Sequence, residues 1–434
     1  MTTIAHHGAP GPSGMISVEE ARARILEHFA PLPTEQALLT EALGQVLAED
    51  VRSGFNIPPM ANTSMDGYAV RAADTEGATT STPRELRVTG YLAAGSVFEG
   101  TVGAGEAVRI MTGAPIPEGA DAVVPFEETD EQEHGRWSEA PRGRVRIDVA
   151  AGAGANIRHA GEDVRAGEVV LPAGTVLGPA QIGVLASLGL DCAPVHRRPR
   201  VAVLSTGDEL LRPGEPLQPG KIYDSNAFGL AAAVRDCGGI PTILEVARDS
   251  VEALTERIHE ALETADLLIT SAGVSRGDFD VVKEVLAREG EVGFWTVRMR
   301  PGKPLAFGTF RAGERTVPHL GLPGNPVSAL MTFELFGRPA LFTLLGKADG
   351  WARPMVRAVT RDRIVNPDPR RFFARAIVRS DGNSYVVNLT GPQGSGVLTS
   401  MALANGYAIV PEDVASIESG GECDVILLGA PLPL

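Results

Sequence analysis

Acidic, basic and hydroxyl side chains gather in short loops that follow apolar runs in the second half of the chain. The loops begin at Thr206, Ser271, Arg298 and Gly324, and Asp224 stands just before a predicted helix. The candidates in them are Thr206, Gly207, Asp208, Glu209, Asp224, Gly273, Ser275, Asp280, Arg300, Lys303, Gly324, Asn325 and Pro326. Carboxylates can hold Mg²⁺ together with substrate phosphates, cations bind anions, and glycine lets a backbone approach a phosphate closely.

The elements around these loops must bring them to one place. From Val201 onward, strand-like apolar runs alternate with predicted helices at 226–235 (capped by Ser225), 249–264 and 280–289. This alternation predicts a parallel sheet with right-handed crossovers. Ligands bind outside the carboxyl ends of such strands, so the candidates should share one edge.

The stretch GLPGNPVS (321–328) is the most specific of these loops. Pro323 and Gly324 permit a sharp turn, Asn325 suits an N-cap and Pro326 suits the first helical position. Apolar residues then recur at helical spacing. A helix start of this kind is an anion site, although an ordinary capped loop would have the same sequence.

Composition limits the class of protein. The chain has 434 residues, which suggests about three domains, and a net charge of −15, which argues against nucleic acid or an anionic membrane as a partner. The three cysteines are far apart, which fits a reducing compartment without a zinc cluster. No apolar run is long enough to span a bilayer, so we expect a cytoplasmic protein.

The other segments show a different pattern. A capping box at 17–20 predicts a helix, and a second helix is expected at 41–48. Short apolar runs between Gly/Pro turns make 51–148 β-rich, and 149–199 is mixed, with a helix from Pro179 that ends at Gly189. Beyond Gly346 the chain is β-rich again, with a hairpin at 381–382.

Five polar positions outside the α/β segment are harder to interpret. Asp66 precedes a glycine in a predicted turn, Thr112 follows a strand-like run and Glu162 lies in a polar loop. Solvated turns and strand ends explain these three equally well. Arg370 and Arg375 belong to a basic cluster that could also be solvated strand faces.

Taken together, the motifs resemble one family. NTSMDGYAV, RIMTGAPIP, RHAGEDV, VLSTGDEL, IYDSN, SAGVSRGDFD, MRPGKPLAFG, GLPGNPVSAL and TGPQGSG occur in this order, as in the molybdopterin molybdenumtransferases (MoeA and the E domain of gephyrin). The resemblance, from about residue 15 onward, implies a multidomain α/β plus β fold. Its domains would be an elongated N-terminal domain (15–50 with 149–198), an inserted β-rich domain (51–148), a parallel α/β molybdopterin-binding domain (199–345) and a C-terminal β-barrel (346–434).

The resemblance also implies an activity. Such enzymes insert molybdate into adenylated molybdopterin, release AMP and need Mg²⁺. They are homodimers in which one subunit's α/β domain faces the partner's N-terminal part, and a separate molybdopterin adenylyltransferase is a candidate partner. By motif, the catalytic positions would be Asp66, Thr112, Glu162, Asp224, Ser275 and Asp280, with Asp224 and Asp280 as Mg²⁺ ligands. The oxyanion positions would include Arg300, Lys303, Ser328, Arg370, Arg375 and Ser395.

Two positions depart from the family pattern. His159 stands where relatives often have arginine, and Arg300 replaces a lysine that is common before PGKP. Arginine keeps the positive charge but offers a bidentate fork.

Three alternatives remain open from the sequence. A related adenylyltransferase shares the α/β domain but normally lacks the flanking domains. A scaffold role would need a partner groove that the sequence does not show. Tungstate shares the shape and charge of molybdate.

Overall fold

The computed structural model describes residues 14–131, 143–245, 251–272, 285, 288, 290–347, 350–380 and 382–433. The chain divides into two compact units. The first unit comprises residues 1–48, 174–182 and 192–434, and the second comprises 49–173 and 183–191. Helix α2 (Pro179–Ser187) crosses the boundary between them.

The first unit is built on a six-stranded sheet of order β15-β12-β16-β20-β19-β17. Its strands are β12 (Arg200–Ser205), β15 (Ile240–Ile243), β16 (Leu267–Ser271), β17 (Gly290–Thr296), β19 (Pro304–Ala312) and β20 (Arg315–Leu322). The first three and β20 run parallel, as predicted, whereas β19 pairs antiparallel with both β17 and β20. Strand β19 was not predicted from the sequence, but the turn between β17 and β19 still lies at the predicted edge.

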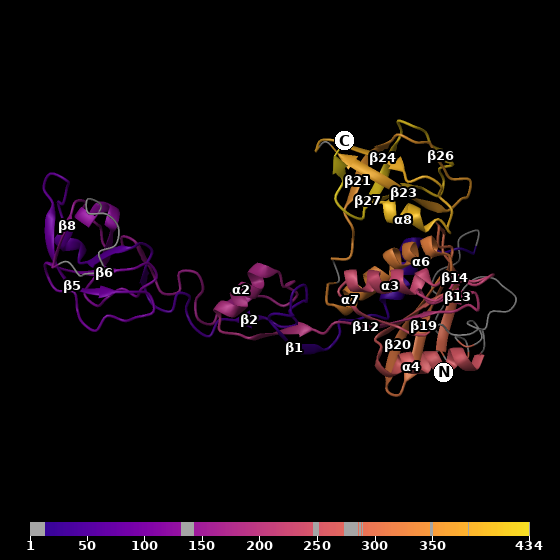
Figure 1. Ribbon diagram of the computed structural model, residues 1–434, viewed down its shortest axis with the longest axis horizontal. Helices are drawn as coiled ribbons and strands as arrows, with labels where there is room; N and C mark the ends of the chain where they lie inside the picture. Colours follow the sequence, from indigo (N-terminus) through magenta and orange to yellow (C-terminus); the bar gives the residue numbers. More distant parts are fainter. Residues whose placement is uncertain are drawn as a thin grey trace. The chain divides into compact units, whose positions relative to one another are not determined.

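Helices cover both faces of this sheet (Figure 1). Helix α4 (Val251–Thr264) packs on one face, and α1 (Val18–Leu26), α3 (Ser225–Asp236), α6 (Pro326–Thr332) and α7 (Arg338–Leu344) pack on the other. A π-helical turn, η4 (Phe333–Gly337), joins α6 to α7. The helices predicted from the capping box at 17–20 and at 226–235 are confirmed, and so is the one predicted at 249–264 over its described residues 251–264. The one at 280–289 falls almost wholly outside the described residues.

The C-terminal part of the first unit is a closed five-stranded barrel. Strands β21 (Met355–Thr360), β23 (Arg371–Ser380), β24 (Tyr385–Leu389), β25 (Gly406–Val410) and β27 (Glu422–Leu427) form it, and closure comes from the pairing of β23 with β25. The predicted hairpin is that of β23 and β24. Smaller elements are β22 (Ile364–Val365), β26 (Ser416–Ile417), β28 (Leu432–Pro433) and α8 (Leu398–Leu403).

The barrel is joined to the α/β part through backbone hydrogen bonds. β18 (Met299–Arg300), which follows β17, pairs in parallel with the start of β23, so that Arg300 lies opposite Phe372. This pairing places Arg300, one of the predicted cations, beside the first strand of the barrel that follows it.

The start of the chain does not contain the helix predicted at 41–48. β1 (Thr34–Leu38) instead pairs with β11 (Cys192–His196), and the following residues form turns and bridges. Gly44 adopts a positive φ of 77°, and the backbone N–H groups of Gly44 and Leu47 donate to Leu177 and Thr175. Tertiary pairing therefore takes the hydrogen bonds that a helix would use.

The second unit is β-rich, as predicted. Its main sheet has the order β7-β4-β6-β5-β8, formed by Ala122–Pro125, Gly67–Val70, Glu106–Ile110, Arg84–Leu92 and Arg144–Ile147. Short pairs join β2 (Val51–Arg52) to β10 (Val169–Leu171) and β3 (Asn62–Thr63) to β9 (Ile157–Arg158). The 3-10 turns η1 (Ala72–Thr75) and η2 (Phe126–Glu128) also belong to this unit.

Candidate active site

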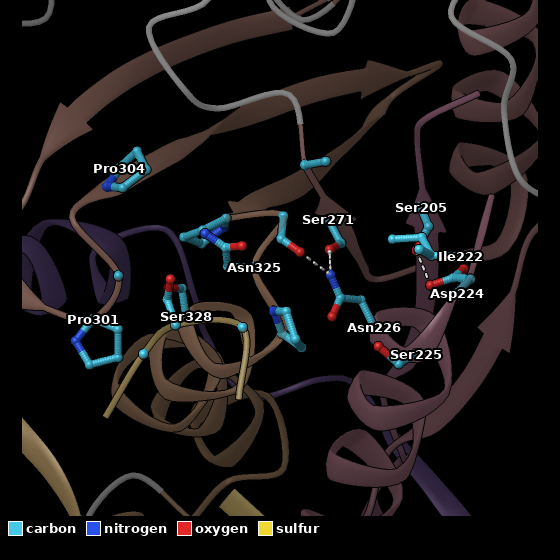
Figure 2. Close-up of a pocket in the computed structure, with 18 of the residues that line it drawn as sticks. Ser205, Ile222, Asp224, Ser225, Asn226, Ser271, Pro301, Pro304, Asn325 and Ser328 are labelled. Atoms are coloured by element: carbon cyan, nitrogen blue, oxygen red, sulfur yellow. Dashed lines mark hydrogen bonds between the residues drawn. The ribbon is translucent and has the colours of Figure 1, made fainter. Parts of the chain in front are cut away.

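A cleft of about 860 Å³ opens at the carboxyl ends of the parallel strands of the first unit. We call it the edge cleft (Figure 2). Its walls come from the ends of β12, β16 and β20, the β18–β19 turn, and two loops of the barrel. The predicted residues that line it are Thr206, Glu209, Asp224, Arg300, Lys303, Gly324, Asn325, Pro326, Ser328, Arg370 and Ser395.

Six predicted positions of the same unit have other outcomes. Gly207 and Asp208 belong to the loop of Thr206 and Glu209 but do not line the edge cleft. Gly273, Ser275 and Asp280 lie outside the described residues. Arg375 does not line the cleft and is considered below.

Asp224 is a buried carboxylate with a structural as well as a candidate chemical role. Its Oδ1 accepts hydrogen bonds from the Ala227 N–H and from the Ser205 hydroxyl, both at 3.0 Å. Asp224, and not Ser225 as predicted, is therefore the N-cap of α3. The cap fixes the carboxylate at the wall of the cleft, as Figure 2 shows.

Three cations, Arg300, Lys303 and Arg370, form what we call the cation group. The guanidinium of Arg300 lies over the Phe372 ring at 4.6 Å, and its buried Nη1 has no hydrogen-bond partner among the described residues. Arg370 is held by Asp368, whose carboxylate accepts from its Nε and Nη2. These bonds, together with the charges of Arg300 and Lys303, lower the pKa of Asp368. Asp368 therefore balances only one of the three charges, and the cation group keeps a net positive charge.

One backbone N–H at the start of α6 is already bonded to the barrel. The Val327 N–H donates to the carbonyl oxygen of Ser395 at 3.1 Å, so a backbone group from the barrel occupies one of the donors that an anion would take. Asn325 is at the N-cap position, as predicted, but its side chain makes no capping hydrogen bond. Ser328 is almost fully buried and lines the edge cleft beneath this contact.

Arg375 is fully buried inside the barrel. Its guanidinium donates to the carbonyl oxygens of Pro392, Gln393 and Gly394 and to the Ser400 hydroxyl, over 2.9–3.2 Å. Burial lowers its pKa to about 10. The structure thus places Arg375 behind the loop that carries Ser395, where it holds that loop.

The second unit brings two further candidates together. The backbone N–H and the hydroxyl of Thr112 both donate to Asp66 Oδ1, at 2.6 and 2.7 Å. The pairing of β4 with β6, which places Gly67 opposite Ile110, creates this Asp66–Thr112 pair. Glu162 is exposed after β9, and its Oε2 accepts from the His159 N–H at 2.9 Å.

Several residues at the cleft were not among those predicted from the sequence. Ser205, Asn226 and Ser271 line the edge cleft, and Phe372 and Asp368 orient its cations. Asn226 and Ser271 lie inside the IYDSN and SAGVSRGDFD motifs, so their position in those motifs was a usable signal. Phe372 and Asp368 carried none, because their roles depend on the β18–β23 pairing.

The donor set can be compared with the needs of Mg²⁺. Across the described ranges, no group of three or more His, Cys, Asp or Glu side chains could hold a metal. Asp224 and Glu209 both line the edge cleft, however, and oxygen ligands from one or two carboxylates are what Mg²⁺ takes when substrate phosphates supply the rest. The residues fit a metal that binds together with its substrate.

Three family models match the chain in succession. They describe the MoeA N-terminal region, domains I and II (residues 16–189), a probable molybdopterin-binding domain (202–343) and the MoeA C-terminal region, domain IV (357–428). None of the described helices has the length and apolar character needed to cross a membrane.

Relatives match over nearly the whole chain. Molybdopterin molybdenumtransferase 2 of Mycobacterium tuberculosis is 42% identical over 417 residues, which cover 95% of this chain and 99% of that protein. The molybdopterin molybdenumtransferase of a Nostoc species is 37% identical over 92% of this chain and 89% of its own. Two crystal structures of a molybdopterin biosynthesis MoeA protein from Pyrococcus horikoshii give TM-scores of 0.79 and 0.75, at 33% and 31% identity. They cover 96% and 95% of this chain and 100% of theirs.

Proposed function

Because the chain belongs to the molybdopterin molybdenumtransferase family, we propose that it inserts molybdate into adenylated molybdopterin and releases AMP. The reaction would be the last step in the formation of the molybdenum cofactor. The two dithiolene thiols of molybdopterin bind molybdenum and give their two protons to one molybdate oxygen, which leaves as water. A separate water molecule cleaves the phosphoanhydride to give AMP and the phosphate of molybdopterin.

The observation that supports the proposal most strongly is the group of cations at the edge cleft. A chain with a net charge of −15 concentrates Arg300, Lys303 and Arg370 around a single cleft and leaves a buried donor of Arg300 without a partner among the described residues. A buried, unpaired charged donor is costly unless an anion completes it. Molybdate and the phosphates of the adenylated pterin are such anions, and fixed cations stabilise the charge that develops during their transfer.

The roles of the acids follow from their positions. We assign Asp224 and Glu209 to the Mg²⁺ that accompanies the phosphoanhydride, with Asp280 as a further ligand by family motif. The metal would neutralise phosphoryl charge. The Ser205 hydroxyl and the α3 N-terminus hold the Asp224 carboxylate in place.

A homodimer is part of the proposal, with the Asp66–Thr112 pair and Glu162 of one subunit serving the cleft of the other. The family resemblance supports it, and light scattering of the purified protein tests it. A second protein, a molybdopterin adenylyltransferase, would supply the substrate.

The direct test measures AMP release from adenylated molybdopterin, with molybdate and Mg²⁺ present or omitted. We expect release that needs both, together with a product that reconstitutes an apo-molybdoenzyme. Binding of the adenylate without release under any condition would refute the transferase and favour a carrier or scaffold. Consumption of ATP and free molybdopterin would identify an adenylyltransferase instead. Replacing molybdate with tungstate in the same assay compares the two oxyanions.

A further inference from the structure

Asn226 lies in the first turn of α3 and lines the edge cleft, two residues after Asp224. We propose that Asn226 is a positioning residue, which holds the ends of β16 and β20 together and thereby sets the shape of the edge cleft. The part of this inference that concerns substrate rests on the proposed function, whereas the part that concerns the strand ends does not.

The carboxamide of Asn226 bridges two loops that are about fifty residues apart in sequence. Its Nδ2 donates to the Ser271 hydroxyl oxygen at 2.7 Å and to the Gly324 carbonyl oxygen at 2.7 Å. Figure 2 shows this side chain between the two loops. The orientation of the amide is fixed by chemistry, because the opposite one would place Oδ1 against the carbonyl oxygen of Gly324.

The Asn226 bridge lies at the end of the β16–β20 strand pairing. β16 and β20 pair in parallel up to Ser271 and Leu322, and one more hydrogen bond runs from the Ala272 N–H to the Leu322 carbonyl. Asn226 Nδ2 binds the Gly324 carbonyl just beyond that last rung, so the side chain extends the backbone pairing of the two strands by one contact.

The two strand ends are also tightly packed against each other. Ala272 has a φ of 84°, a left-handed conformation that a residue with a Cβ adopts at a cost. A Cβ placed on Gly324 would lie 3.2 Å from the Ala272 Cβ, so the turns have little room between them. Strained conformations persist only where surrounding contacts hold them, and Asn226 supplies such a contact on both sides of this junction.

The acceptor of the same carboxamide supports this interpretation. Asn226 Oδ1 is buried and has no hydrogen-bond partner within the described part of the chain. An unpaired buried acceptor opposes folding, so the side chain's own hydrogen bonding is not fully satisfied in this position. The orientation serves the two acceptors on the neighbouring loops.

Both loops that Asn226 bridges contribute residues to the edge cleft. Asn325, Pro326 and Ser328 follow Gly324 directly and line the cleft, as do Ser271 and Ala272 on the other side. Release of the bridge would let the α6 start and the β16 end move apart. Binding of an anionic substrate that contacts both should then weaken more than the chemical step.

The experiment compares Asn226→Asp and Asn226→Ala with Asn405→Asp in the full-length protein. Asn405 is a matched control, because its Nδ2 likewise donates to two acceptors, the backbone carbonyls of Val378 and Ala430, but it does not line the edge cleft. Amide hydrogen exchange of the unliganded proteins, followed by mass spectrometry, reports the strand ends. Steady-state AMP release from adenylated molybdopterin reports the cleft.

We expect amide exchange in peptides that cover 267–272 and 320–328 to become at least about tenfold faster in both Asn226 variants and to stay unchanged there in Asn405→Asp. The KM for adenylated molybdopterin should rise about tenfold or more in the Asn226 variants, with kcat within about threefold of wild type. Unchanged exchange overturns the proposal, even if KM rises, because Asn226 would then act on substrate directly. Faster exchange with an unchanged KM also overturns it. If the wild-type protein releases no AMP, the proposed function fails, and the exchange data alone decide whether Asn226 holds the strand ends.

Discussion

The edge cleft of the first unit and the Asp66–Thr112 pair of the second unit are both polar, but they are built differently. The pair arises from neighbouring strands of one sheet, and its two hydrogen bonds join residues that the β4–β6 pairing already places together. In the cleft, Asn226 ties two loops of the α/β part, Arg375 ties a loop of the barrel, and the Val327–Ser395 backbone contact joins the two parts. Local pairing can assemble a half-buried acid such as Asp66, whereas a cation site needs buried supports from several segments.

The largest effect that distinguishes the two regions should come from Asp224→Asn. Asparagine keeps an acceptor for the Ala227 N–H and the Ser205 hydroxyl, so the free energy of unfolding should change by less than about 0.5 kcal/mol. Loss of the negative charge should lower AMP release by about 100-fold or more if Asp224 serves Mg²⁺. Thermal unfolding and AMP-release assays measure the two effects.

A matched change at the same position separates the roles further. Asp224→Ala removes the cap as well as the charge and should cost about 1 kcal/mol of stability. Wild-type activity of Asp224→Asn would remove Asp224 from the chemistry and leave it as a helix cap only.

The next largest effect should come from Arg375→Met, because Arg375 holds the barrel loop that carries Ser395. Arg375→Met should lower the free energy of unfolding by about 2–4 kcal/mol, because three carbonyl groups and the Ser400 hydroxyl lose their buried donor. The KM for molybdate should rise as the Ser395 loop loosens. Chemical denaturation and molybdate titration measure these changes.

Arg370→Met is the comparison for that experiment. Arg370 is only half-buried beside Asp368, so its removal should weaken molybdate binding with a smaller loss of stability. If Arg375→Met instead kept full stability and lost molybdate binding, Arg375 would contact the oxyanion directly, as the family motif suggests.

Acid should destabilise the first unit through His319. This histidine is fully buried next to the Thr270 hydroxyl, and burial lowers its pKa to about 3. The unfolded chain binds a proton at about pH 6.5, so stability should be complete above that pH and fall by up to about 1.4 kcal/mol per pH unit as the pH drops toward 3. Denaturation curves between pH 4 and 7.5 measure the slope.

His319→Gln provides the control, because glutamine does not titrate. The difference in unfolding free energy between wild type and variant should shrink as the pH falls. Parallel pH profiles would show that His319 does not contribute to the acid sensitivity.

The smallest effect is expected in the second unit. Thr112→Val removes one of two donors to Asp66 Oδ1 and leaves the Thr112 N–H in place, so AMP release should fall only about 3- to 10-fold. Thr89→Val, in the same sheet, removes a hydroxyl that donates weakly to the Ala107 carbonyl and should leave activity unchanged. A loss as large as that of Asp224→Asn would show that the hydroxyl itself takes part in the chemistry.

The sequence predicted those features that depend on neighbours in the chain. Apolar periodicity placed α1, α3, α4 and the strands of the parallel sheet, and polar residues at strand ends located most of the edge cleft. The helix expected at 41–48 was wrong, because Leu47 and Gly44 pair with a segment about 130 residues away.

Features that depend on distant segments could not be predicted. Arg375 looks like any other strand arginine in sequence, and only the closed barrel shows that it faces inward onto the 392–394 carbonyls. Phe372 became the partner of Arg300 through the parallel pairing of two-residue β18 with β23, which has no pattern of its own in the sequence.

The short β18–β23 pairing has a consequence for protein engineering. The barrel cannot simply be exchanged between relatives, because two contacts join it to the α/β part. Strand β23 pairs with Met299 and Arg300, and the Ser395 carbonyl accepts a hydrogen bond from the Val327 N–H of α6. A hybrid enzyme would have to preserve both the β18–β23 pairing and the Val327–Ser395 hydrogen bond. A truncated chain that ends near residue 345 would leave Arg300 on an unpaired strand and would lack Arg370, so it would lose the geometry of the anion site while keeping every residue of the α/β domain.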